Sequence, residues 1–183
     1  KRQRILVSGA SGVVGRQLCA FLTSGGHDVW RLVRKIKLDA ENEILWDPQN
    51  NAIDKEKLEG FDVVIHLAGE NVDGRWSAAK KKRILDSRVL GTRLLSKTLS
   101  ELNDKPAVFI GASGVSYYGS HASEAFDEDS PRGTGFLADV VEAWETETRS
   151  AKQAGIRVVN LRIGVVLTLL GGALKKMVLP VKL

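Results

Sequence analysis

The chain has 183 residues, of which 43% are hydrophobic and 27% charged, and its formal net charge is +5. These values are typical of one soluble globular domain, which we expect to span residues 1–183. No apolar run approaches the roughly 20 residues that a membrane span requires, and the first residues carry no signal-peptide pattern. The single cysteine, Cys19, excludes an internal disulfide framework and favours a reducing, cytoplasmic location.

Strand-like and helix-like segments alternate along the chain. Apolar runs predict strands over residues 5–8, 27–33, 43–46, 63–67, 107–111 and 157–163, and helical spacing predicts helices over 12–23, 76–102 and 136–154. Residues 118–135 have no periodic pattern, which predicts a functional flap or a partly disordered insertion. The alternation predicts an α/β fold of the Rossmann type, a doubly wound parallel sheet with helices on both faces in three layers.

Three glycines spaced three residues apart follow the first predicted strand. Gly9 would permit a tight turn, Gly12 the close approach of a pyrophosphate and Gly15 close packing of helix on strand. A helix that begins here presents unpaired N–H groups and partial positive charge, which attract a phosphate. The pattern predicts dinucleotide binding, with a plain structural turn as the alternative. The expected contacts are Gly9, Ser11, Gly12, Val13, Val14 and Gly15.

Two cationic residues, Arg34 and Lys35, follow the second predicted strand, about 20 residues beyond the glycine loop. An acidic residue at this place accepts from a free 2′-hydroxyl, whereas an arginine accommodates a 2′-phosphate. After this strand, no acidic residue occurs until Asp39. Arg34 can bind phosphate oxygens bidentately and Lys35 adds a point charge. We therefore predict NADP(H) as the cofactor, with a solvated strand exit as the alternative.

The fourth predicted strand ends in small residues, at the edge where open α/β sheets bind ligands. Ala68 and Gly69 would let a ribose lie against the backbone. His66 stands between apolar neighbours and is interpreted as a core histidine, with a catalytic base as the lesser alternative. Trp76 and Trp144 are interpreted as core anchors of their helices. The further cofactor contacts expected at this edge are Leu67, Ala68, Gly69 and Glu70.

Two charge clusters invite other functions. The cationic run over residues 80–83 lies in a long predicted helix whose apolar residues mark the opposite face, which favours a solvated face over a phosphate-backbone patch. We therefore expect no nucleic-acid partner. The acidic residues between 124 and 129 have no histidine among them and lie in the predicted loop, which favours a solvated turn over a metal site.

Further short motifs run almost from end to end of the chain. With the glycine loop they make the sequence resemble the extended short-chain dehydrogenase/reductase superfamily, and more closely a sugar-nucleotide-epimerase-like subgroup of its NAD-dependent epimerase/dehydratase family. The matching segments are residues 46–48, 66–71, 75–76, 87–89, 91–93, 113–119, 135–138, 144–145, 161–167 and 171–174.

The resemblance implies NADP(H) in the crevice of the sheet and a small-molecule substrate, with a sugar nucleotide as the candidate. It also implies a substrate-binding half formed mainly from a C-terminal part, which we expect to be missing after residue 183. Apolar surface intended for that part should then be exposed, which favours either self-association, as in a homo-oligomer, or disorder near residue 183.

The superfamily's reaction uses a tyrosine and a lysine four residues apart on one helical face. The aligned positions here are Phe136 and Val140, neither of which can transfer a proton. Arg88 replaces an asparagine that the superfamily often uses, and it is kept as a candidate cofactor contact. The remaining catalytic candidates are Ser113, Tyr117 and Tyr118. Two hypotheses stay open: an NADP(H)-dependent epimerase/reductase-like enzyme, or a cofactor-binding sensor or regulatory module without turnover.

Overall fold

The chain folds around one seven-stranded sheet. The computed structural model describes residues 1–36, 41–120, 125–171, 174 and 178. Within these ranges six strands pair in parallel, and β4 alone runs antiparallel, beside β3. The strands, in their order across the sheet, are β4 (Ala52–Ile53), β3 (Glu43–Asp47), β2 (Asp28–Val33), β1 (Arg4–Ser8), β5 (Val63–His66), β6 (Val108–Gly114) and β7 (Arg157–Ile163).

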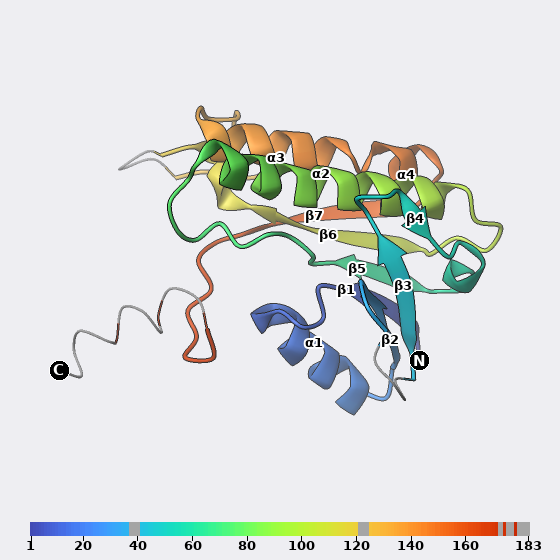
Figure 1. Ribbon diagram of the computed structural model, residues 1–183. Coiled ribbons are helices and arrows are strands. Elements are labelled where there is room, and N and C mark those ends of the chain that lie inside the picture. The colour runs from blue at the N-terminus through green and yellow to red at the C-terminus, as the bar shows by residue number, and fades with distance from the viewer. Residues whose placement is uncertain (37–40, 121–124, 172–173, 175–177, 179–183) are drawn as a thin grey trace.

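Helices cover both faces of this sheet. Figure 1 shows α1 (Val13–Ser24) on one face, and α2 (Ala78–Ser100), α3 (Phe136–Thr146) and α4 (Arg149–Gln153) on the other. Two short 3₁₀ helices, η1 (Glu56–Leu58) and η2 (Val115–Tyr118), lie in the connections. The three layers and the parallel strand order confirm the doubly wound, Rossmann-type α/β fold. Among the described residues, no helix has both the length and the apolar character that a membrane crossing needs.

The core has two parts because successive side chains of a strand point to opposite faces of the sheet. Leu6, Val64 and Phe109 are buried together with side chains of α2 and α4. The intervening residues Val7 and Ile65 pack toward α1 on the other face. Each buried side chain of this size contributes about 2 kcal/mol of transfer free energy. The alternation therefore fixes the strands between the two helical layers.

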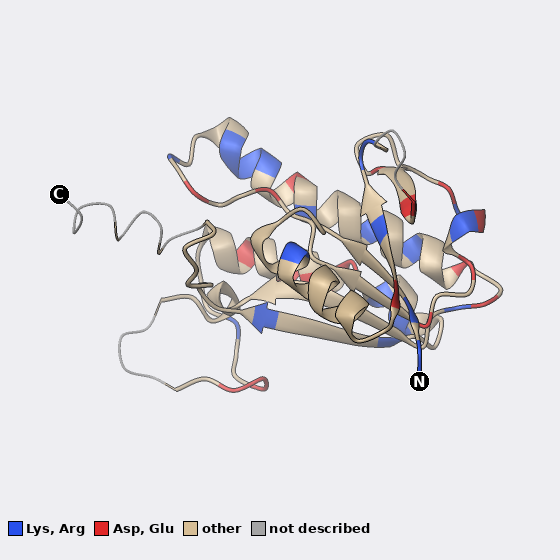
Figure 2. Ribbon diagram, turned by 90° about the horizontal axis from the view of Figure 1, so that it is seen from below, with Lys and Arg blue, Asp and Glu red and all other residues tan. Residues whose placement is uncertain are grey.

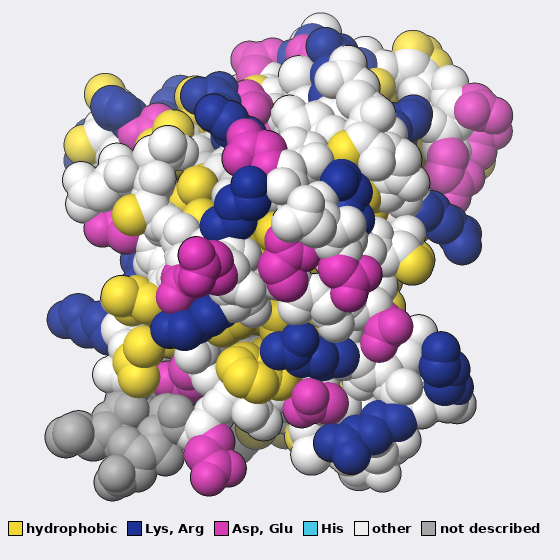
Figure 3. Space-filling view, turned by 90° about the vertical axis from the view of Figure 1, so that its right-hand side faces the viewer, with side chains coloured by type: hydrophobic (Ala, Val, Ile, Leu, Met, Phe, Trp, Pro, Cys, Tyr) yellow, Lys and Arg dark blue, Asp and Glu magenta, His cyan; other side chains and the backbone are white. Residues whose placement is uncertain are grey.

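The order of the parallel strands indicates where a ligand would bind. The chain runs outward from β1 through β2 to β3 and then returns to β5 on the other side of β1. Open α/β sheets bind ligands beyond the carboxyl ends of the strands at such a reversal. The opposite end of the molecule, where β1 begins, carries acidic and basic side chains intermixed over the visible face (Figure 3).

The helical segment predicted over residues 136–154 is in fact two helices. α3 ends at Thr146 and α4 begins at Arg149. The hydroxyl of Thr148 donates to the carbonyl oxygen of Glu145 at 2.7 Å, so a side chain takes an acceptor near the end of α3. The prediction of one continuous helix was wrong because this competition lies inside an otherwise helical apolar pattern.

The two tryptophans interpreted as core anchors differ. Trp144 is buried, as expected, but Trp76 precedes α2 and its side chain is 40% exposed. The indole N–H of Trp76 donates to the carbonyl oxygen of Val72 at 2.7 Å, and its ring meets the edge of Phe136. The core interpretation of Trp76 was wrong because the helix begins two residues later than predicted, at Ala78.

The segment after β7 returns toward α1. An isolated bridge joins Thr168 and Gly171 in an antiparallel turn. A Cβ placed on Gly171 would lie 3.0 Å from Cγ2 of Val13, so this turn packs against the first residue of α1. Several apolar side chains of the segment are exposed, among them Val165, Leu167 and Leu169. Apolar side chains are therefore exposed in the segment after β7, and their relation to a further C-terminal part stays a prediction.

Candidate functional site

The glycine loop joins β1 to α1 in a turn that side chains would obstruct. Gly9 has φ +69°, and a Cβ there would lie 2.7 Å from the carbonyl carbon of Leu67. A Cβ on Gly15 would lie 2.3 Å from the carbonyl oxygen of Gly9. The N–H of Gly12 donates to the same oxygen at 3.0 Å and closes the turn. Gly9 and Gly15 are therefore required by close backbone approaches.

The N-terminus of α1 is open to an anion. Gly12 is the N-cap residue, with no side-chain hydrogen bond to the helix and no acidic residue in its first turn. Ser11 and Val14 are exposed beside it, and Val13 is half-buried. The first N–H groups of a helix lack partners within the helix and carry partial positive charge. These residues therefore fit a dinucleotide diphosphate, which supplies the missing acceptors.

Arg34 and Lys35 lie at the exit of β2 and are both exposed. The pKa of Asp47 is lowered first by the hydrogen bond from Asn50, and the charge of Arg34 adds to this effect. Arg34 also contributes to the lowered pKa of Glu70, so its guanidinium lies within electrostatic reach of the exits of both β3 and β5. We call the glycine loop, Arg34 and residues 67–70, where the sequence predicts cofactor contacts, the cofactor crevice.

A buried hydroxyl forms the floor of the cofactor crevice. Ser8 Oγ accepts hydrogen bonds from the N–H groups of Leu67 at 3.2 Å and Ala68 at 3.3 Å. With its own proton directed to Nδ1 of His66 at 2.6 Å, the ring proton is on Nε2, for which the described residues provide no acceptor. Burial lowers the pKa of His66 to about 4. His66 is a neutral core histidine that orients Ser8, and Ser8 fixes the exit of β5.

Two adjacent residues of α2 hold the next part of the crevice. The N–H of Glu70 donates to Ser87 Oγ at 2.9 Å, and Arg88 donates to the carbonyl oxygen of Glu70 at 3.0 Å. The guanidinium carbon of Arg88 lies 5.0 Å from the centre of the Trp144 ring and 3.4 Å from a Cβ placed on Gly69. Arg88 therefore reaches the crevice, where its hydrogen bond to the carbonyl oxygen fixes the backbone of Glu70.

A second polar site lies at the ends of β6 and β7, and we call it the Glu145 network. Ser113 is 5% exposed, and its hydroxyl donates to the carboxylate of Glu145. Arg162 donates to both oxygens of that carboxylate at 3.0 Å and to the hydroxyl of Tyr118 at 2.8 Å. The guanidinium also lies 3.6 Å from the centre of the Tyr117 ring. The hydrogen bonds to Glu145 contribute most to the raised pKa of Arg162.

The three catalytic candidates thus lie close together, but each of them contacts a member of the Glu145 network. Ser113 and Tyr118 both bond within the Glu145 network, and Tyr117 is covered by a cation. The positions aligned with the superfamily's tyrosine and lysine carry no proton donor: Phe136 is half-buried against Trp76, and Val140 is 1% exposed in the core. The catalytic roles of Ser113, Tyr117 and Tyr118 stay predictions.

Sequence reasoning missed Glu145, Arg162 and Ser8. Glu145 and Arg162 are 17 residues apart and meet only because α3 packs on β6, the strand beside β7. Ser8 looked like an ordinary last residue of a strand, and its partner His66 lies 58 residues away. The available signal was the segment 144–145 itself, which carried the resemblance without an assigned role. No cluster of three potential metal ligands occurs in the described parts of the chain, and Glu124 lies outside them.

A family model for the NAD-dependent epimerase/dehydratase family matches residues 5–169, which include both polar sites. The chain belongs to this family. An epimerase family protein of Mycobacterium bovis is 40% identical over 174 residues, which cover 94% of this chain and 57% of that protein. The human epimerase family protein SDR39U1 is 34% identical over 184 residues, which cover 98% of this chain and 60% of that protein. The resemblance seen in the sequence is thus confirmed.

Solved structures agree with the fold. A crystal structure described as a nucleoside-diphosphate sugar epimerase from Corynebacterium glutamicum matches with a TM-score of 0.84 at 36% identity, covering 97% of this chain and 37% of that one. The crystal structure of human SDR39U1, described as containing NADPH, matches with a TM-score of 0.83 at 34% identity, covering 97% of this chain and 59% of that one. The chain therefore spans less than two thirds of the length of these relatives.

Proposed function

We propose that this family member binds a nicotinamide dinucleotide in the cofactor crevice and prefers NADP(H). The observation that carries the proposal is the uncapped N-terminus of α1 behind a glycine loop in which side chains would clash. Such a helix end binds a diphosphate through its free N–H groups. The human relative described with NADPH supports the same assignment.

The preference for NADP(H) rests on Arg34 at the exit of β2. Its guanidinium is exposed. The acidic groups at the exits of β3 and β5, Asp47 and Glu70, have their own partners in Asn50 and Lys80. A guanidinium can bind a 2′-phosphate bidentately, which a 2′-hydroxyl cannot match.

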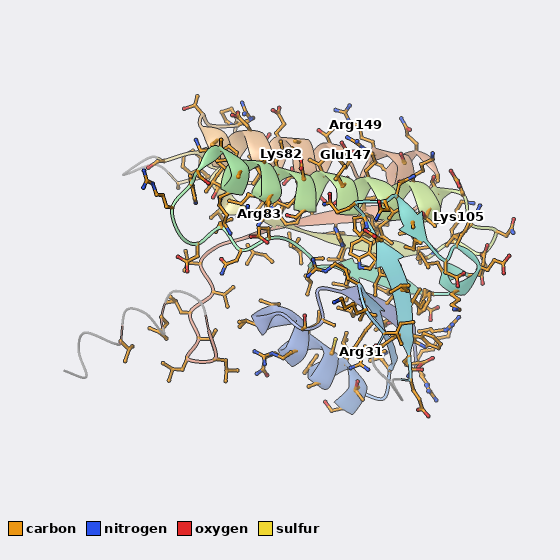
Figure 4. All side chains as sticks on the ribbon, viewed as in Figure 1. Arg31, Lys82, Arg83, Lys105, Glu147 and Arg149 are labelled. Carbon is orange, nitrogen blue, oxygen red and sulfur yellow. The ribbon has the colours of Figure 1, made fainter. Side chains whose placement is uncertain are left out.

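Calorimetry on the full-length protein tests both parts of this proposal. We expect NADPH to bind more tightly than NADH. Arg34→Ala should weaken NADPH binding about tenfold, because one charge-assisted contact is lost, and should change NADH binding less than about twofold. Lys105→Ala is the control, since Lys105 lies at the far end of the molecule (Figure 4). No binding of either dinucleotide would refute the proposal, and an unchanged NADPH/NADH ratio would refute the role of Arg34.

For the reaction, we propose an epimerase/reductase-like activity on a small-molecule substrate, with a sugar nucleotide as the first candidate. The relative described as a nucleoside-diphosphate sugar epimerase supports this substrate class. When bound, the nicotinamide would supply hydride chemistry. The chain's own residues would position it, with Ser8 and Arg88 fixing the exit of β5. A cytoplasmic location and a homo-oligomeric state stay predictions from the sequence.

The alternative is a cofactor-binding sensor or regulatory module that performs no turnover. Phe136 and Val140 favour it, because neither can exchange a proton with a substrate. The Glu145 network also favours a module without turnover, because its polar side chains hydrogen-bond to each other. Screening the full-length protein for substrate-dependent oxidation of NADPH separates the two. Turnover with any sugar nucleotide would refute the sensor.

A further inference from the structure

The cationic run on α2 does not present all of its charges to solvent. The ammonium of Lys80 donates to a carboxylate oxygen of Glu70 at 2.7 Å, and its side chain is only 14% exposed. Nε of Arg83 lies 3.8 Å from the same oxygen. Lys82 instead pairs with Asp86 one turn along α2 and is 76% exposed. Two members of the run are therefore directed at the exit of β5.

Figures 2 and 4 show the same division. In Figure 2, Lys and Arg segments mark the first turns of α2. In Figure 4, Arg83 lies on the side of α2 that faces the segment from β5, whereas Lys82 lies on the other side of the helix. The interpretation of residues 80–83 as one solvated helix face therefore holds for Lys82 and is wrong for Lys80.

The local charge around Glu70 is positive, because its single carboxylate pairs with both Lys80 and Arg83. The pKa of its carboxyl group is lowered first by the hydrogen bond from Lys80, and the charges of Lys80, Arg83 and Arg34 add to this effect. The Glu70 carboxylate thus contacts Lys80 and lies 3.8 Å from Arg83, and the charge of Arg34 acts on it from a greater distance. A second anion would be attracted to this place, and the diphosphate of a dinucleotide has the required charge.

We infer that Lys80 and Arg83 bind the diphosphate bridge of the cofactor, and that Glu70 holds them in position when no phosphate is present. The inference rests on the proposed dinucleotide binding. It adds two residues of α2 to a site otherwise formed by the glycine loop.

The strand order indicates that Lys80 and Arg83 lie nearer to the diphosphate of a bound dinucleotide than to its 2′-phosphate. The exits of β2, β1 and β5 lie side by side, so Arg34 is on one side of the glycine loop and Glu70 is on the other. The loop packs directly on the exit of β5, where a Cβ on Gly9 would meet Leu67. A diphosphate at the N-terminus of α1 therefore lies beside the exit of β5. The 2′-phosphate is expected at the exit of β2.

This division predicts different effects on the two cofactors. The diphosphate is common to NADPH and NADH, so Lys80→Gln and Arg83→Gln should weaken the binding of both by a similar factor. We expect about tenfold for Lys80→Gln, the loss of one contact between charged groups, and less for the more exposed Arg83. Arg34→Ala should weaken NADPH alone. Lys82→Gln, the same change on the same helix, is the matched control.

The role of Glu70 gives a second test. Its carboxylate has the same sign of charge as the diphosphate, so Glu70→Gln should strengthen the binding of both dinucleotides. In the double variant Glu70→Gln with Lys80→Gln, binding should fall well below that of Glu70→Gln alone, because the direct contact of Lys80 is lost. Equal binding by these two variants would mean that Lys80 only neutralises Glu70, and would overturn the inference.

The measurements are calorimetric titrations of the full-length protein with NADPH and NADH, repeated at low and high salt, with thermal denaturation to confirm that each variant is folded. If the natural protein binds and Lys80→Gln behaves like Lys82→Gln, the inference is wrong while the proposed function stands. If Lys80→Gln changes the NADPH/NADH ratio as Arg34→Ala does, the assignment to the diphosphate is wrong. If the natural protein binds neither dinucleotide, the proposed function itself fails.

Discussion

The cofactor crevice and the Glu145 network lie at the same edge of one sheet, but they use polar groups in opposite ways. In the crevice, the N-terminus of α1 has no side-chain cap, and two cations, Lys80 and Arg83, lie beside the carboxylate of Glu70. In the network, Ser113, Glu145, Arg162 and Tyr118 bond to each other. The first region has hydrogen-bonding capacity left for a ligand, and the second has used most of its capacity internally.

This difference indicates that the features needed to bind a cofactor are present, whereas those of the superfamily's usual proton transfer are not. A site for a ligand must leave donors or charges to be matched by that ligand. The crevice does so, whereas the place where the superfamily carries its proton-transferring pair holds Phe136 and Val140. If the two regions differ in this way, substitutions in the crevice should change cofactor affinity. Substitutions in the Glu145 network should change stability instead.

The largest effect is expected at Gly15. In Gly15→Ala the new methyl group would lie 2.3 Å from the carbonyl oxygen of Gly9, so the backbone of the glycine loop must move. Because the same loop presents the N–H groups of α1, we expect NADPH affinity to fall at least about a hundredfold by calorimetry. Gly164→Ala is the control, since a Cβ there would meet nothing within 4 Å. Unchanged NADPH affinity in Gly15→Ala would show that the glycine loop does not bind the cofactor and would contradict the contrast between the two regions.

The next effect concerns pH and the floor of the crevice. The pKa of His66 is lowered to about 4, against 6.5 for the free side chain. Between these values the unfolded chain binds a proton that the folded chain does not, so stability falls as pH decreases from 6.5 toward 4. From pH 7 to pH 5 we expect a loss of about 2 kcal/mol from this residue alone.

Urea denaturation at several pH values measures this loss. His66→Gln removes the titrating group and keeps a polar side chain beside Ser8, so the dependence of its stability on pH should be flatter than that of the natural protein between about pH 5 and pH 7. Parallel curves for the two proteins would show that His66 does not titrate as its burial requires.

A smaller effect is expected in the Glu145 network. Glu145→Gln removes the charge that Arg162 faces, with both side chains largely buried, and should lower the free energy of unfolding by about 1.5 kcal/mol. NADPH affinity should change less than about twofold. Glu142→Gln, on the same helix, removes a more exposed carboxylate that pairs with Arg132, and should cost less than the Glu145→Gln change. A large fall in NADPH affinity in Glu145→Gln would mean that the network belongs to the cofactor site.

The sequence was informative wherever a local pattern determines the structure. Apolar runs located β1, β5 and β6, and the spacing of Gly9, Gly12 and Gly15 located the turn before α1. The short β4 was missed, because two residues carry no periodicity. The break between α3 and α4 was missed because one hydroxyl, that of Thr148, competes with the helix.

Contacts between distant segments could not be predicted in the same way. The bond from Ser8 to His66 and the pair of Glu145 with Arg162 depend on which elements become neighbours in the folded sheet. The cations at Lys80 and Lys82 look equivalent in the sequence. Only the position of Glu70 beside the first turn of α2 distinguishes them.

The contact between Gly171 and Val13 has a dynamic consequence. The segment that leaves β7, at one edge of the sheet, reaches back to the first residue of the helix that follows β1 in the middle. Local opening of a protein usually releases a contiguous unit. An opening that frees residues 164–171 would also uncover Val13, the first residue of α1, so loosening at the sheet edge and loosening beside the glycine loop should occur as one motion.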